Sequence, residues 1–304
     1  MSNANWRAKR LAQLSTGSEV AETSRGLIEF VQSGSPPFVM QLHGTPGGYD
    51  QSILLGEPFL DAGMGSISVS RPGYLRTPID VGRTPAEQAD ALAALLDTLQ
   101  IERVAVQGVS GGGPSAIQFA VRHPERITVL FLTCAVSGAY PVVIPAWSNL
   151  LMTPFGMRMG EWMLSKFPRA TVKQVIGEES TYSAEQVKQA TDRVMSDSRL
   201  MDFLKGMTQS STPWEDRRQG FDNDIEAIRA IEKEPLPLEA VQCPTLIVHG
   251  TADDDVPYSV AVQAHSRMKE AELYTVENAC HLLWIDPGIE AMNQRQVEFL
   301  RAHV

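Results

Sequence analysis

Ser110 lies at the centre of the glycine-rich segment GVSGG (108–112). An apolar segment at 103–107 precedes it and favours a β-strand, whereas the residues that follow favour a helix. In the G-x-S-x-G pattern a strand turns abruptly into a helix and holds the serine at the apex in a strained conformation, with glycines where larger side chains would collide. Such a turn exposes the serine hydroxyl. The sequence therefore predicts Ser110 as a catalytic nucleophile.

Two residues that could activate this serine follow later strands. A serine hydroxyl is a poor nucleophile until a base takes its proton, and a histidine base needs a carboxylate that fixes its tautomer. Asp253 comes shortly after the apolar segment at 245–249, and His281 comes shortly after the one at 272–276. Because both segments are expected strands of the sheet that holds the serine, we predict Asp253 as the acid and His281 as the base.

Other carboxylates and histidines fit these two roles less well. Asp254 and Asp255 adjoin Asp253, but Asp253 has the distance from the strand end that the pattern requires. The loop after the apolar segment at 127–133 is an alternative position for the acid, and it has no carboxylate. The remaining candidate bases are expected in helices, at a strand end or at the C-terminus: His123, His265, His249 and His303.

A second glycine-rich loop, HGTPGG (43–48), follows the apolar segment at 38–42. The oxyanion that forms during acyl transfer needs backbone N–H donors. Gly111 N–H, at the positive end of the helix after the serine, supplies one donor, and Thr45 N–H is the candidate for the other. We expect His43 to brace this loop rather than to act as a base.

Short apolar segments alternate with helix-period segments along most of the chain, which is typical of a mostly parallel α/β sheet with helices on both faces. The segment at 84–99 has the signature of a capped helix, with Thr84 as N-cap and Glu87 as its capping-box partner. The strands at 27–31 and 38–42 are separated by a Gly-Ser-Pro-Pro turn and are expected to form an antiparallel hairpin. The predicted strands are 27–31, 38–42, 66–70, 103–107, 127–133, 245–249 and 272–276.

Residues 137–239 interrupt this alternation with a segment whose pattern is helical. The segment is rich in methionine and tryptophan, and Ser183 with Gln186 predicts a capped helix inside it. At the carboxyl edge of a sheet such an insert could form an apolar lid over a substrate, or its side chains could pack a core of their own. The candidate substrate-binding residues are Met152, Met157, Trp162 and Met163.

Composition excludes several classes of partner. Lys and Arg number 26 against 36 Asp and Glu, which gives a formal charge of −10, so neither nucleic acid nor an anionic membrane is expected. The three cysteines lack metal-ligand spacing and are expected as buried thiols in a reducing compartment. Because no signal-peptide pattern and no run of about 18 apolar residues occurs, we expect a cytoplasmic protein that acts on a small molecule.

Five segments together resemble the α/β-hydrolase superfamily, in particular its lid-bearing serine members: HGTPGG (43–48), SRPGY (70–74), LDTLQIERVAVQGVSGGG (96–113), HGTADDDVP (249–257) and ACHLLW (279–284). The resemblance implies an eight-stranded sheet, a triad of Ser110, Asp253 and His281 in that order along the chain, and no cofactor or metal. It also implies a hydrolase core at 25–136 and 240–304, a helical lid at 137–239 after the sixth strand, and an N-terminal extension at 1–24.

Within this superfamily the sequence favours hydrolysis of a carboxylic ester of a small to medium apolar substrate through an acyl-enzyme. A serine nucleophile argues against the haloalkane dehalogenase and epoxide hydrolase branches, whose nucleophile is aspartate. The alternatives are a C–C bond hydrolase and an aminopeptidase. HGTPGG resembles a loop of proline iminopeptidases, but Gly111 stands where those enzymes usually carry tryptophan. Carboxylates in 214–228 could hold a substrate ammonium, although such a charge run is typical of a solvated helix face.

Two further interpretations lie outside this class of enzyme. Residues 111–116 match the G-x-G-x-x-A pattern of dinucleotide-binding folds, but 127–136 lack the acidic residue that such a site requires. A ligand receptor that keeps the hydrolase fold without catalysis is the non-enzyme alternative. Turnover of an activated ester would favour the enzyme.

Overall fold

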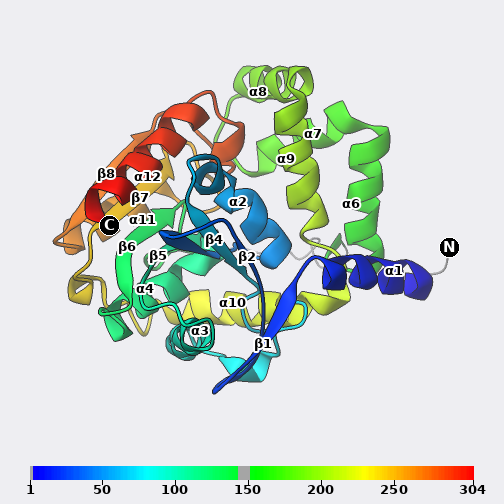
Figure 1. Cartoon of the computed structure of the whole chain (residues 1–304). Helices are drawn as coiled ribbons and strands as arrows, with labels where there is room; N and C mark the ends of the chain where they lie inside the picture. Colours follow the sequence, from blue (N-terminus) through cyan, green and yellow to red (C-terminus); the bar gives the residue numbers. More distant parts are fainter. Residues whose placement is uncertain (1–2, 143–150) are drawn as a thin grey trace.

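The computed structural model describes residues 3–142 and 151–304, and its centre is an eight-stranded sheet. The strand order is β1-β2-β4-β3-β5-β6-β7-β8 (Figure 1). β2 is antiparallel to both of its neighbours, and the other neighbouring strands are parallel, as the alternating sequence pattern predicts. The strands are β1 (Glu19–Thr23), β2 (Gly26–Ser33), β3 (Phe38–Leu42), β4 (Gly65–Val69), β5 (Val104–Val109), β6 (Ile127–Thr133), β7 (Thr245–Gly250) and β8 (Ala271–Val276).

The antiparallel edge differs from the expected hairpin. β2 pairs with β1 and β4, whereas β3 pairs with β4 and β5, so the predicted pairing of 27–31 with 38–42 is wrong. β1 has no counterpart among the predicted strands, because its sequence EVAET is short and buries a single side chain, Ala21. Residues 19–23 therefore belong to the sheet, and the extension predicted at 1–24 ends before them, with the helix α1 (Asn3–Thr16) as its main element.

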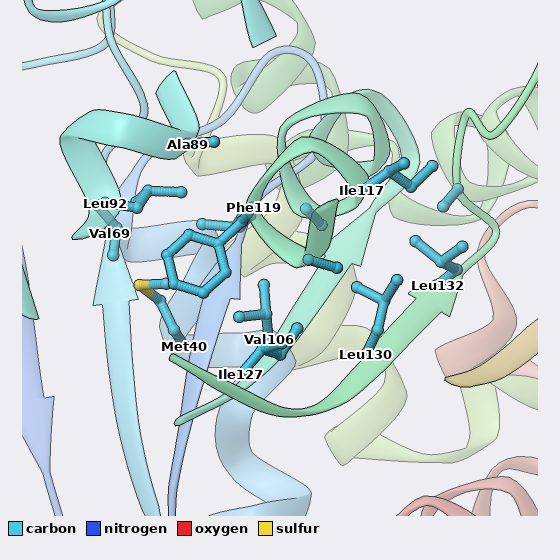
Figure 2. Close-up of a cluster of buried hydrophobic side chains, with 14 of the residues drawn as sticks. Met40, Val69, Ala89, Leu92, Val106, Ile117, Phe119, Ile127, Leu130 and Leu132 are labelled. Atoms are coloured by element: carbon cyan, nitrogen blue, oxygen red, sulfur yellow. The ribbon is translucent and has the colours of Figure 1, made fainter. Parts of the chain in front are cut away.

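Helices cover both faces of the sheet. Successive side chains of a strand point to opposite faces, so Val39 and Met40 of β3 contribute to two separate apolar clusters. Figure 2 shows one of these clusters, in which Met40 and Val106 of the sheet lie against Phe119. One face is covered by α2 (Tyr49–Asp61) and α12 (Ile289–His303), and the other by α3 (Pro85–Thr98), α4 (Gly113–Arg122) and α11 (Tyr258–Arg267).

The helix α3 begins as the sequence predicts. Thr84 Oγ1 accepts a hydrogen bond from Glu87 N at 3.2 Å, and the Glu87 carboxylate accepts one from Thr84 N at 2.9 Å. This capping box satisfies two backbone donors that the first turn of a helix leaves free. Leu92 and Leu96 are buried behind it, which places the apolar side of α3 against α4.

Between β6 and β7 the described chain is helical, and we call residues 137–239 the insert. Figure 1 shows α6, α7, α8 and α9 grouped beside the sheet, with α10 apart from them. Asn223 Nδ2 of α10 donates to the Arg83 carbonyl, just before α3, at 2.8 Å. The helices in the described part of the insert are α6 (Pro154–Lys166), α7 (Pro168–Glu178), α8 (Ala184–Ser196), α9 (Ser198–Gln209) and α10 (Arg218–Ala230).

The insert shares an apolar cluster with the chain after β8. Val172, Ile176 and Val194 of the insert pack in one cluster with Leu282 and Ile285. The predicted capping box of Ser183 and Gln186 is present at the start of α8. The described chain also contains short 3₁₀ turns: η1 (Ile79–Val81), η2 (Ser110–Gly112), η3 (Trp214–Asp216), η4 (Leu238–Ala240) and η5 (Leu283–Ile285).

The three cysteines are buried thiols, as the sequence predicts. Cys134, Cys243 and Cys280 are buried and unpaired, and burial raises the pKa of each thiol, so none is poised as a nucleophile. In the described ranges no helix combines the length and the apolar character that crossing a bilayer requires.

Candidate active site

Ser110 stands at the sharp turn that the sequence predicts. It follows β5 directly, begins η2, and has a φ of 47°, in the left-handed region that L-residues seldom adopt. A Cβ on Gly108 would lie 2.7 Å from Ala116 Cβ, and one on Gly112 would lie 2.5 Å from the Leu42 carbonyl oxygen. Glycines at these two positions therefore let the helix α4 follow the strand closely and keep the serine at the apex.

Asp253 and His281 meet at the same edge of the sheet. His281 Nδ1 lies 2.8 Å from Asp253 Oδ2, and because a carboxylate accepts, the imidazole donates. Asp253 Oδ1 accepts from the backbone N–H groups of Asp255 and Val256, which fixes the loop after β7. The Asp253 side chain is fully buried, whereas Asp254 is exposed. Among the three consecutive aspartates, Asp253 thus has the geometry of the orienting acid.

His249 is a second partner of this carboxylate. Its Nε2 lies 2.8 Å from the Val256 carbonyl oxygen and 3.1 Å from Asp253 Oδ2, within a fully buried side chain. Burial raises the pKa of Asp253, but the two histidines outweigh it and lower this pKa to about 2. The sequence places His249 at a strand end without assigning it a role. Its position four residues before Asp253 could have indicated this contact.

Two more carboxylates lie near the imidazole of His281. Nε2 lies 3.4 Å from Asp255 Oδ2, and the Glu179 carboxylate lies within 4.8 Å of both groups. Glu179 follows α7, and its carbonyl oxygen accepts from His281 N at 3.0 Å. Sequence reasoning treats Asp255 only as an alternative acid and does not find Glu179, because its position depends on how the insert packs against the chain after β8.

These carboxylates control the protonation of His281. Burial lowers the pKa of His281, but Asp253, Asp255 and Glu179 together raise it to about 10. Burial raises the pKa of Glu179 to about 7 against the opposing effect of His281. The three groups have atom types that bind divalent metals, but a metal on Nε2 would occupy the lone pair that a general base needs. We therefore interpret the acidic pair as an electrostatic environment for His281.

The loop at 43–48 lies against the serine turn. A Cβ on Gly44 would lie 3.2 Å from Ser110 Cβ, and one on Gly111 would lie 2.1 Å from Thr45 Oγ1 and 3.6 Å from Thr45 N. Thr45 and Gly111, the two candidates for the oxyanion hole, are thus brought into contact beside Ser110. Their roles as donors stay a prediction.

His43 braces this loop. Its Nδ1 lies 2.7 Å from the Gly44 carbonyl oxygen, and its Nε2 accepts from Arg71 N at 3.0 Å. The side chain is fully buried, and burial together with Arg71 holds its pKa well below the ordinary value. Both ring nitrogens are engaged, so His43 has the supporting role that we expect from the sequence.

The four candidate substrate-binding residues lie on or beside α6. Met152 precedes the helix, and Met157 and Met163 are half-buried within it. Trp162 is 49% exposed and packs edge to face against Phe167. Their part in binding a substrate stays a prediction.

The charged segment at 214–228 is only in part the solvated helix face that its pattern predicts. Its run of charges is typical of a solvated helix face, yet Asp224 is 3% exposed and pairs with Arg71, while Asp216 pairs with Arg7. Arg217 of the same segment is fully buried and pairs with Asp50. These carboxylates are committed to arginines, so a substrate ammonium is not their partner.

Known proteins resemble this chain over most of its length. A family model described as alpha/beta hydrolase fold matches residues 36–287. An uncharacterized hydrolase of Bacillus subtilis is 27% identical over 268 residues, 86% of this chain and 90% of that protein. A 2-hydroxy-6-oxononadienedioate/2-hydroxy-6-oxononatrienedioate hydrolase of Pseudomonas putida is 26% identical over 274 residues, 86% of this chain and 87% of that protein. Among solved structures, an alpha/beta hydrolase fold protein from Nakamurella multipartita has a TM-score of 0.87 at 34% identity, covering 94% of this chain and 99% of that one.

Proposed function

Because the chain belongs to the α/β-hydrolase fold family, we propose that it is a serine hydrolase that cleaves carboxylic esters of small to medium apolar substrates. The observation that carries this proposal is the buried hydrogen bond between Asp253 and His281, at the edge of the sheet where Ser110 occupies a left-handed turn. Three buried, unpaired cysteines suit a reducing compartment, so we place the activity in the cytoplasm.

The reaction has two halves. Ser110 Oγ attacks the acyl carbon while His281 Nε2 takes its proton, and Asp253 stabilises the imidazolium through Nδ1. The carbonyl oxygen gains negative charge, which the N–H groups of Thr45 and Gly111 would stabilise. Collapse expels the alcohol, which receives the proton from Nε2. Water then attacks the acyl-enzyme with His281 as base, and Ser110 regains its proton as the acid leaves.

The charge of the site favours a neutral ester over an anionic substrate. Asp255 and Glu179 lie near the imidazole of His281, so a substrate carboxylate near the reacting bond would be repelled. The substrate named for the Pseudomonas putida relative is a dienedioate, which carries two carboxylates. Similarity to that protein over most of both chains keeps C–C bond hydrolysis as the second candidate function.

An aminopeptidase is the remaining alternative. The acidic pair of Asp255 and Glu179 could attract a substrate ammonium. However, the tryptophan that proline iminopeptidases usually carry after the serine would not fit at Gly111, because a Cβ there would lie 2.1 Å from Thr45 Oγ1. The local packing therefore supports the esterase more than this peptidase.

The test compares matched substrates on the purified protein. The panel contains p-nitrophenyl esters from acetyl to octanoyl, an ester of matched length with a terminal carboxylate, aminoacyl p-nitroanilides and 2-hydroxy-6-oxononadienedioate. We expect kcat/KM to rise about fourfold for each of the first methylenes and then to fall, since burial of a methylene is worth about 0.8 kcal/mol. The anionic ester should be slower than its neutral counterpart.

The Ser110→Ala variant is the control for the mechanism. It should lower kcat by about 10⁴ or more, the scale expected for loss of a triad nucleophile. Near-normal ester turnover by this variant would contradict the acyl-enzyme. Faster cleavage of the dienedioate than of any ester would favour the C–C hydrolase, and faster cleavage of anilides would favour the aminopeptidase.

A further inference from the structure

Asp224, on α10 of the insert, lies in a buried polar network with the oxyanion loop. Its Oδ2 accepts from Thr45 Oγ1 at 2.6 Å, from Arg71 Nη2 at 2.6 Å and from Tyr74 Oη at 2.5 Å. Its Oδ1 accepts from Arg71 Nη1 at 2.8 Å. The Arg71 and Asp224 side chains are 1% and 4% exposed. Charged hydrogen bonds of this kind fix geometry strongly when they are shielded from water.

The arginine of this network also holds the backbone of the oxyanion loop. Arg71 Nε donates to the His43 carbonyl at 3.0 Å, and Nη2 donates to the Gly44 carbonyl at 3.2 Å and to Thr45 Oγ1 at 3.2 Å. Asp224 therefore fixes Thr45 in two ways, directly through its hydroxyl and indirectly through the guanidinium.

Close packing between α10 and the turn that carries Tyr74 sets the position of Asp224. Gly220 N donates to the Gly73 carbonyl at 3.0 Å, and a Cβ on Gly73 would lie 2.7 Å from Gly220 Cα. A Cβ on Gly220 would lie 2.3 Å from the Tyr74 ring. Asp224 lies four residues after Gly220, on the same side of the helix, so this contact directs its carboxylate to Arg71 and Thr45.

A second arginine connects the insert to the same loop and to the helix α2 that follows it. Arg217, just before α10, donates from Nη1 to the Gly47 carbonyl at 2.6 Å and pairs with Asp50 at 2.8 Å. This contact limits how far the loop can move when Asp224 is changed. Loss of Asp224 should therefore displace Thr45 without releasing the whole loop.

We propose that Asp224 is a positioning residue for the oxyanion hole, through which the insert sets the place of the Thr45 N–H relative to the Gly111 N–H. The inference rests on the proposed function, because it assumes that an oxyanion forms at these two donors. An oxyanion donor must lie about 2.7–3.1 Å from the developing charge, so a small displacement of Thr45 weakens transition-state binding more than substrate binding.

The first experiment measures the Asp224→Asn variant with the best ester from the panel. We expect kcat to fall about 10- to 100-fold, less than the 10²- to 10³-fold for complete loss of an oxyanion donor, with KM nearly unchanged. The affinity for an alkylboronic acid, which forms a tetrahedral adduct on Ser110, should fall by a similar factor. A rise in KM alone, or unchanged kcat, would overturn the inference.

The matched control is Asp216→Asn. It makes the same substitution in the same insert and removes the ion pair with Arg7, which lies on α1 rather than on the oxyanion loop. We expect this variant to keep its kcat and its affinity for the boronic acid. An equal loss of kcat in both variants would assign the effect to general loosening of the insert and would overturn the inference.

If Asp224→Asn fails to fold, variants of Thr45 test the positioning role of Asp224. Thr45→Val removes the hydroxyl and leaves the Arg71–Asp224 pair intact, so kcat should fall with little change in KM, and Thr45→Ser should restore most of the loss. Where Asp224→Asn folds, its loss and that of Thr45→Val should be less than additive in a double-mutant cycle, because both changes weaken the Thr45–Asp224 hydrogen bond. Additive losses, or full kcat in Thr45→Val, would contradict the inference.

Labelling of Ser110 separates this inference from the proposed function. If a fluorophosphonate does not label Ser110 and Ser110→Ala keeps its turnover, the proposed function fails and the inference fails with it. If Ser110 is labelled and required while Asp224→Asn keeps full kcat, the proposed function stands and the positioning role alone is wrong.

Discussion

Two buried carboxylates at this site, Asp253 and Asp224, come from different parts of the molecule and have different kinds of partner. Asp253 lies on the loop after β7 and contacts the imidazole of His281. Asp224 lies on α10 of the insert and contacts the guanidinium of Arg71. An imidazole gains and loses its charge near neutral pH, whereas a guanidinium keeps its charge at every pH at which the protein is folded.

This difference separates a charge that the reaction uses from a charge that holds structure. In the proposed reaction, an imidazolium forms next to Asp253 when His281 takes the serine proton, and the carboxylate stabilises it. Asp224 faces the same cation before and after that step, so its contribution is geometric. We therefore expect Asp253 to control both the rate and its pH dependence, and Asp224 to control the rate alone.

Of the substitutions that distinguish the two carboxylates, Asp253→Asn should lower kcat the most. An amide can keep the hydrogen bond but favours the wrong tautomer of His281, so kcat should fall by about 10⁴, the scale known for this change in a Ser-His-Asp triad. Asp254→Asn is the matched control, because Asp254 is the exposed neighbour of Asp253. Steady-state kinetics on both variants measure the effect. Similar losses at both positions would show that the acid is misassigned.

The pH profile tests whether the acidic pair controls His281. Burial lowers the pKa of His281, but nearby carboxylates raise it to about 10, and a general base must be unprotonated. Below this pKa, kcat/KM should rise about tenfold per pH unit, so activity should increase well into the alkaline range. Asp255→Asn removes one negative charge, which lowers the pKa of His281, moves the rising limb to lower pH and increases the rate at neutral pH.

Initial rates from about pH 6 to about pH 11 measure this profile, with Ser110→Ala as the blank for spontaneous hydrolysis. The Asp224→Asn variant should keep the wild-type limb, because Arg71 stays charged throughout. An unmoved limb in Asp255→Asn would show that Asp255 does not control His281. A shifted limb in Asp224→Asn would remove the distinction between the two carboxylates.

Local sequence predicts the parts of the site that belong to the sheet. The strand-turn-helix at Ser110 and the position of Asp253 after β7 depend on residues within a few positions of each other. The capping boxes at Thr84 and Ser183 also depend on residues three positions apart, and the structure confirms both. The family resemblance supplied the eight-strand count and the order of the site residues along the chain.

The features that sequence could not predict depend on distant contacts. Glu179 reaches His281 because the insert packs against the chain after β8, and Asp224 reaches Arg71 across 153 positions in the chain. The charges around Asp224 have the pattern of a solvated helix. Helical periodicity does not reveal that a buried arginine from another element pairs with one of them, so the burial of Asp224 could not be predicted. The wrong hairpin has a similar cause, since β4, which follows both strands in the sequence, lies between β2 and β3 in the sheet.

The smallest expected effect tests the packing that positions Asp224. In a helix, Gly→Ala normally stabilises by about 0.5–1 kcal/mol. Gly160→Ala in α6 should follow this rule, because a Cβ there would have nothing within 4 Å. Gly220→Ala should instead destabilise by about 1–3 kcal/mol, since its Cβ would lie 2.3 Å from the buried Tyr74 ring and would force α10 away from it.

Thermal unfolding should therefore move in opposite directions for these two variants. In Gly220→Ala the carboxylate of Asp224 should shift with α10, so kcat should fall several-fold at constant KM, while the pH limb set by Asp253 and His281 stays in place. Gly160→Ala should keep the wild-type kcat. Stabilisation of Gly220→Ala to the same degree as Gly160→Ala would show that α10 is not closely packed against Tyr74. The geometric role of Asp224 would then lose its structural basis, while the role of Asp253 in proton transfer would be unaffected.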